Sequence, residues 1–261
     1  GTANAINIQT ALKASGNIQV ANEEGDLNVI ANTEVEGQRV LLYASESINN
    51  HASIASQQET NLLAGKNIHN NAAITSDDYI VVAALAGDIY NTGSINSVNS
   101  IDMDAFAGNV YNHANITTSN ETVDIFAGKH LINLGNVSTS KGSITLLAKE
   151  NVLNTGTMEA VQGDINIISQ DGIIVNVLEA DLLTGKGNVT LRAESTDGSY
   201  YYLKDNQLLR LEAAQVQFST KGEPYYEDAN HNKYAVVKNG SIFNAGDILA
   251  LGGTITMETL Q

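Results

Sequence analysis

Asparagine recurs along this chain at an interval of 20 to 22 residues. The recurring positions are Asn50, Asn70, Asn91, Asn112, Asn133, Asn154 and Asn176. An aliphatic residue stands two positions before each of them, and another apolar residue stands four positions after each of the first six. Such regular self-similarity predicts a repeat architecture, in which each unit buries its apolar face against its neighbours.

A second apolar pattern, with a period of two, precedes most of the repeated Asn residues. It is seen in Val123, Ile125 and Ala127, and again in Ile144, Leu146 and Ala148. The residues between them include polar ones such as Asp124 and Thr145. Because a period of two indicates β-strands, we expect one face of each strand to meet a core and the other to face solvent.

Two or three short strands in about 21 residues leave no room for a helix and describe one coil of a solenoid. The composition agrees, since a single Pro and abundant Asn, Ile, Val, Ser and Thr favour strands and turns. We therefore predict an all-β fold, a right-handed parallel β-helix whose coils stack about 4.8 Å apart. Gly residues at the corners, such as Gly65 and Gly87, indicate a positive φ or a close backbone approach.

The repeated Asn residues are expected to lie directly over one another in successive coils. A side-chain amide both donates and accepts hydrogen bonds, so stacked Asn side chains can form a ladder along the axis. Asn also tolerates the left-handed backbone of a tight corner. The Asn column is therefore predicted to be structural and not a ligand site.

Two segments carry a resemblance to a known family. Residues 61–70 read NLLAGKNIHN and residues 122–128 read TVDIFAG. They resemble the haemagglutinin repeats of two-partner-secreted exoproteins, the family of filamentous haemagglutinin and of contact-dependent growth inhibition stalks. The resemblance covers residues 40–194 well and 1–39 loosely, and it returns at 240–261.

The resemblance implies a long fibre, secreted from a Gram-negative bacterium and held at the cell surface. It implies an outer-membrane transporter as the partner in secretion, and a protein or glycan on a host or target cell as the partner in binding. The secretion domain of the family usually carries an Asn-Pro-Asn motif. Since the only Pro here is Pro224, we expect this chain to come from the interior or a more distal part of such a fibre.

The repeat stops after Glu194 and resumes at Gly240, which predicts coils at 1–194 and 239–261 and an extrahelical insertion at 195–238. The insertion is expected to form two hairpins, around residues 204–207 and 228–233, with a helix over 206–217 as the alternative. Its Tyr residues are predicted either to contact a protein or glycan, or to pack the insertion onto the rod. They are Tyr200, Tyr201, Tyr202, Tyr225, Tyr226 and Tyr234.

The residue just before each repeated Asn is mostly apolar or aromatic, although alternation places it outside. This stripe runs through Asn49, His69, Tyr90, Tyr111, Ile132, Leu153 and Val175, and it returns at Phe243. We expect a second core to close over the stripe, formed by the insertion or by corner loops. The alternative is an apolar strip left open for a partner.

The charge of the chain argues against nucleic acid and anionic lipid as partners. It carries 13 Lys and Arg against 29 Asp and Glu, a formal net charge of −16, which repels phosphates. No run of 18 apolar residues and no basic start followed by an apolar stretch is found, so we expect neither a membrane span nor a signal peptide. With no Cys, disulfides and thiolate metal sites are excluded.

The sequence predicts no enzyme, no cofactor and no metal site. The nearest catalytic candidate is an acidic group of Asp102, Asp104 and Asp124, in which Asp104 and Asp124 are expected to stack on successive coils. Stacked carboxylates could share Ca²⁺ or raise a pKa. Without Lys or Arg in register, a solvated acidic face is the favoured interpretation, and the five His are scattered.

We therefore expect a segment of a secreted bacterial adhesin fibre, a rigid stalk whose insertion contacts a receptor. The stalk of a contact-dependent growth inhibition effector is the first alternative. A carbohydrate-active enzyme on the same fold and a spacer with no ligand are the others.

Overall fold

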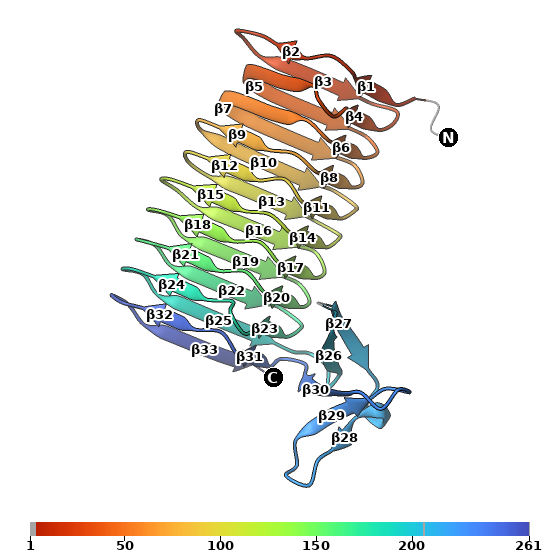
Figure 1. Cartoon of the computed structure of the whole chain (residues 1–261), viewed down its shortest axis with the longest axis vertical. Coiled ribbons are helices and arrows are strands. Elements are labelled where there is room, and N and C mark those ends of the chain that lie inside the picture. Colours follow the sequence, from red (N-terminus) through yellow and green to blue (C-terminus); the bar gives the residue numbers. More distant parts are fainter. Residues whose placement is uncertain (1–3, 206, 261) are drawn as a thin grey trace.

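The computed structural model describes residues 4–205 and 207–260. Residues 1–3 and 261, at the ends of the two predicted coil regions, lie outside the described residues, as does Asn206, where the alternative helix would begin. The described chain is a stack of parallel β coils with one projecting sheet (Figure 1). The predicted parallel β-helix with coils of about 21 residues is confirmed.

One sheet of ten parallel strands takes one strand from each coil. Its strands are β1 (Ile6–Ile8), β4 (Leu27–Val29), β6 (Ile48–Asn50), β8 (Ile68–Asn70), β11 (Ile89–Asn91), β14 (Val110–Asn112), β17 (Leu131–Asn133), β20 (Val152–Asn154), β23 (Ile174–Asn176) and β31 (Ile242–Asn244).

The second, 18-stranded sheet wraps around the rest of each coil. Its strands are β2 (Leu12–Lys13), β3 (Ile18–Asn22), β5 (Glu34–Ala44), β7 (Ser53–Ala64), β9 (Ile74–Ser76), β10 (Tyr79–Ala84), β12 (Ile95–Ser97), β13 (Ile101–Ala105), β15 (Ile116–Thr118), β16 (Val123–Ala127), β18 (Val137–Thr139), β19 (Ile144–Ala148), β21 (Met158–Ala160), β22 (Ile165–Ser169), β24 (Leu182–Thr184), β25 (Val189–Glu194), β32 (Ile248–Ala250) and β33 (Ile255–Leu260). Most coils supply two of these strands, whereas β5 and β7 run through both positions.

The core is a set of files in which like residues stack on like. Ile89, for example, lies between Ile68 and Val110 in register, and all three are fully buried. Burial of such aliphatic side chains is the main favourable contribution to folding, and the free energy gained is roughly proportional to the apolar area removed from water. The inward residues of the sequence pattern therefore form one continuous core along the rod.

The repeated Asn side chains lie inside this core and form a ladder. Each side-chain Nδ2 donates to the Oδ1 of the Asn in the next coil at 2.7 Å, from Asn50 through to Asn176. The ladder continues to Asn244, which also accepts from Asn176 at 2.7 Å. In several coils the same Nδ2 also donates to a backbone carbonyl two residues on, such as Gly135 for Asn133.

The backbone of the ladder differs from one expectation. None of the ladder Asn residues has a positive φ, since the described non-Gly residues with positive φ are Asn32, Glu179, Asp205 and His231. The column therefore depends on the hydrogen-bonding capacity of Asn and not on its tolerance of left-handed backbone. The corner glycines Gly65 and Gly87 likewise have no positive φ, and a Cβ at either position would collide with the preceding coil.

The insertion forms a separate five-stranded antiparallel sheet beside the last coils (Figure 1). Its elements are β26 (Tyr200–Lys204), β27 (Gln207–Leu211), the 3-10 turn Ala213–Gln215, β28 (Gln217–Phe218), β29 (Pro224–Glu227) and β30 (Lys233–Lys238). Both predicted hairpins are present, because β26 pairs with β27 and β29 pairs with β30. The alternative helix over 206–217 is wrong, since its described part is mostly strand.

Candidate functional site

The insertion is held on the rod by a small second core. Tyr201 of the insertion packs with Leu153 and Val175, which stand just before two ladder Asn residues. Tyr201 is 8 % exposed and Leu153 is fully buried. For this part of the outward stripe, the predicted burial under the insertion is confirmed.

Among the described residues, those of the insertion that form this second core do not pack against the upstream part of the stripe. The rings of His69, Tyr90 and Tyr111 stack on one another with centroids 4.8 Å apart and nearly parallel planes. All three side chains are half-buried. Burial, with the hydrogen bond from the Tyr90 hydroxyl to Asp88, raises the pKa of Tyr90 to about 12. The aromatic faces are therefore covered mainly by each other, and the prediction of a second core over the whole stripe is wrong for these residues.

The six Tyr residues of the insertion do not form one site. Tyr201 faces the rod, whereas Tyr202, Tyr226 and Tyr234 cluster on the other face of the sheet, with ring centroids 4.7 to 6.2 Å apart. The Tyr234 hydroxyl donates to Asp228 at 3.1 Å. Tyr201 therefore packs the insertion onto the rod, whereas contact of the cluster with a protein or glycan stays a prediction.

The two remaining Tyr residues have different surroundings. Tyr225 lines the side of the sheet that faces the rod, where the ammonium of Lys233 lies 4.8 Å from its ring centroid. Tyr200 lies in β26 between β27 and β30 and is half-buried. Neither belongs to the cluster of Tyr202, Tyr226 and Tyr234.

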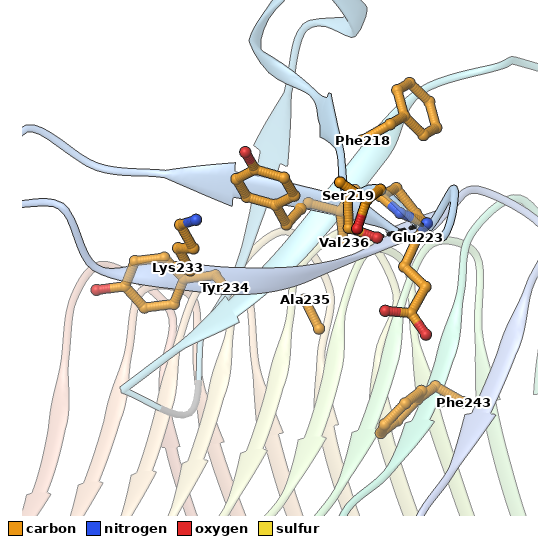
Figure 2. Close-up of a pocket in the computed structure, with 11 residues that line it drawn as sticks. Phe218, Ser219, Glu223, Lys233, Tyr234, Ala235, Val236 and Phe243 are labelled. Atoms are coloured by element: carbon orange, nitrogen blue, oxygen red, sulfur yellow. Dashed lines mark hydrogen bonds between the residues drawn. The ribbon is translucent and has the colours of Figure 1, made fainter.

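An open groove of about 780 Å³ lies between the insertion and the last coil (Figure 2). Phe218 extends from the insertion and Phe243 from the rod, and they are 63 % and 45 % exposed. Glu223 and Lys233 supply opposite charges to the same groove. Exposed aromatic rings with polar groups between them are typical of ligand-binding clefts, because the rings give contact area and the polar groups give orientation.

Sequence reasoning reached only part of this groove. Phe243 is the last member of the outward stripe, for which burial was expected, and its exposure corrects that expectation. The cause is that the insertion covers Val175 but leaves room beside Phe243, which also lines a second cavity of about 280 Å³. Nothing in the sequence singled out Glu223 or Lys233, which line the same groove from opposite ends of the paired strands β29 and β30.

The acidic group on the rod is arranged differently from the prediction. Asp102 is the residue in register with Asp124, whereas Asp104 lies between Ala83 and Phe126. The expected stacking of Asp104 on Asp124 is therefore wrong. The link from β15 to β16 has one residue more than the link from β12 to β13, so the interval here is 22 residues.

Burial changes the acidity of this group. Desolvation, with smaller contributions from Asp102 and Asp124, raises the pKa of Asp104 to about 6. None of the ion pairs in residues 4–205 and 207–260 includes these three carboxylates. In the same residues, no group of three or more His, Cys, Asp or Glu is placed to hold a metal ion.

Replacing Asp104 by Asn is expected to stabilise the protein at pH 7 by about 1 kcal/mol, after allowance for the half-exposed position. The folded pKa is raised from 3.8, so protonation favours the folded state. In the wild type, the stabilisation that protonated Asp104 gives to the folded state is fully present below pH 3.8 and is lost as the pH rises through about 6. Urea unfolding of both proteins at pH 4 and pH 7 checks it, with the exposed Asp77→Asn as control. A gain that is larger at pH 4 would contradict it.

Comparison with known proteins adds no relative. No protein-family model matches the chain, and no match is found among curated proteins or solved structures. Among the described residues, no helix has the length and apolar character needed to cross a membrane.

Proposed function

We propose that this chain is a segment of a secreted adhesin fibre at a bacterial cell surface. The coils act as a stiff stalk, and the insertion contacts a protein or glycan of a host or target cell. The resemblance to the repeats of filamentous haemagglutinin supports this proposal, and secretion would use an outer-membrane transporter partner. In this proposal the chain acts by binding and catalyses no reaction.

The observation that carries the proposal is the groove with Phe218 and Phe243. The insertion buries Tyr201 against the rod and so has a fixed position. It nevertheless leaves two large aromatic side chains exposed on opposite sides of an open groove. A fixed projection with uncovered aromatic surface suits recognition, because little conformational entropy is lost when a partner binds.

The rod suits the role of a stalk for a separate reason. Backbone pairing and the Asn ladder connect each coil to the next, so the structure repeats along one direction without a second layer. In such solenoids each unit contacts only its neighbours, and length can increase without a change of fold. The stalk of a contact-dependent growth inhibition effector has the same requirements and remains the alternative, with a bacterial target cell in place of a host cell.

Cell labelling tests the proposal. The fluorescently labelled protein is expected to bind at least one cell type in a panel of animal and bacterial cells, measured by flow cytometry. The double variant Phe218→Ser, Phe243→Ser is expected to bind at least tenfold more weakly, because the groove loses both aromatic surfaces. Leu251→Ser, which changes an apolar residue that is 73 % exposed on the rod, is the matched control.

Each outcome is informative. Binding to bacterial cells alone would favour the growth inhibition stalk. Equal binding by the double variant and the wild type would exclude the groove as the contact. Absence of binding to every cell in the panel would leave the rod as a spacer and contradict the adhesin.

A further inference from the structure

A column of outward-facing side chains on the large sheet is apolar or aromatic in six of seven successive coils. Strand pairing places these residues in one file: Tyr43, Leu63, Ala83, Asp104, Phe126, Leu147 and Ile168. Six of the seven are apolar or aromatic. At about 4.8 Å per coil, the column is about 29 Å long.

The fold itself does not require this column to be apolar. The outward column of the neighbouring strands β9, β12, β15, β18 and β21 is polar in the same coils, with Thr75, Asn96, Thr117, Ser138 and Glu159 in register. A soluble sheet face normally alternates apolar inside and polar outside. An apolar file on the outer face therefore indicates a surface that meets a partner.

Two exposed residues widen the column into a patch. Leu85 is 59 % exposed and Phe106 is 47 % exposed, and both follow the strands that carry Ala83 and Asp104. The ring of Phe106 lies 6.2 Å from that of Phe126. We call Leu85, Phe106 and the seven residues of the column the outer strip.

Asp104 stands in the middle of the column, with three members on either side. Within the described residues its carboxylate has no ion pair, and its pKa is affected by burial and by the charges of Asp102 and Asp124. Asp102 and Asp124 add negative charge beside it. A partner that covered the strip without a cation would bury this charge unpaired, which is strongly unfavourable.

The negative charge of Asp104 distinguishes between the possible partners of the outer strip. A second copy bound face to face through the same strip would bring like carboxylates together, and an anionic lipid surface would be repelled in the same way. A basic side chain opposite Asp104 would instead form a charge-assisted hydrogen bond in a largely apolar contact.

We propose that the outer strip is the docking surface of a partner protein that presents an elongated apolar stripe with a Lys or Arg near its middle. The contact lies on the rod and is independent of the insertion and of the function proposed for it. Its apolar part provides the affinity and Asp104 provides the selectivity.

Selection from a phage-displayed library of random 20-residue peptides tests the proposal. Peptides enriched on the immobilised full chain are expected to combine apolar residues with a central Lys or Arg. They are expected to bind the double variant Phe126→Thr, Leu147→Thr at least tenfold more weakly. Thr is a good strand former, so both substitutions suit the sheet. Asn96→Ser, on the polar column, is the control, and unfolding curves of all variants check that each is folded.

Charge reversal separates the role of Asp104 from that of the apolar residues. Selection on Asp104→Lys is expected to enrich Asp or Glu in place of Lys or Arg. Enrichment of the same peptides on both proteins, no enrichment at all, or equal binding to the double variant would overturn the proposal. Sedimentation of the wild type gives a further check, because a dimer abolished by the double variant would assign the strip to a second copy.

Discussion

Replacing Asn112 by Ala is expected to lower the free energy of unfolding by about 3 to 5 kcal/mol. The Asn112 side chain accepts from Asn91, donates to Asn133 and donates to the backbone carbonyl of Ala114. Asn112 and its ladder neighbours Asn91 and Asn133 are fully buried. Without the amide, several buried polar groups have no partner and water cannot reach them, and each such group costs about 1 to 3 kcal/mol.

Urea unfolding followed by far-ultraviolet circular dichroism measures this effect. The matched control is Asn166→Ala, because Asn166 lies on an outward position of β22 and is only half-buried. The control is expected to change stability by less than about 0.5 kcal/mol. Similar losses for the two variants would show that the ladder contributes little, and would remove the structural reason for the repeat.

Replacing Gly156 by Ala is expected to cost about 3 kcal/mol or more. A Cβ at this position would collide with the carbonyl oxygen of Gly135 in the preceding coil. Backbone atoms of stacked coils cannot move apart without breaking strand pairing on both sides. Relief of the steric clash would therefore cost backbone hydrogen bonds. Differential scanning calorimetry is the measurement.

Gly198→Ala is the control for this substitution. Gly198 has no atom within 4 Å of an added Cβ, and its φ is not positive. Ala there is expected to leave stability unchanged or to raise it by about 0.4 to 1 kcal/mol, since it restricts the unfolded chain. If Gly156→Ala melts at the same temperature as Gly198→Ala, the close approach of the coils does not require glycine at position 156.

The coils could be predicted from sequence because the same residue types are required at equivalent positions of every coil. Each coil needs the same residue type in the core and an Asn in the ladder, so one pattern appears many times. An average interval of about 21 residues nevertheless does not show that some corners are one residue longer than others. The extra residue before β16 makes the interval there 22 while Asn112 and Asn133 remain 21 apart, so Phe126 lies beside Asp104, and Asp124 lies beside Asp102.

The functional surfaces were harder to predict because they depend on how elements pack. The alternation in β16 was correct, but only its first outward residue, Asp124, is polar. The second, Phe126, belongs to the outer strip, and only the strand register shows that Leu147 and Ile168 continue it. The hairpins of the insertion follow from local sequence, whereas the groove at Phe243 is lined by residues of both the insertion and the rod and so depends on how the two pack.

The insertion also affects the order in which the molecule assembles. Equivalent residues of most neighbouring coils are about 21 residues apart, so only a short loop has to close when one coil pairs with the preceding one. The coil that contains Asn244 must find its partner Asn176 across 68 residues. The longer loop makes closure about 1 kcal/mol less favourable. We therefore expect the coil after the insertion to join the rod more slowly than a coil that is reached through about 21 residues.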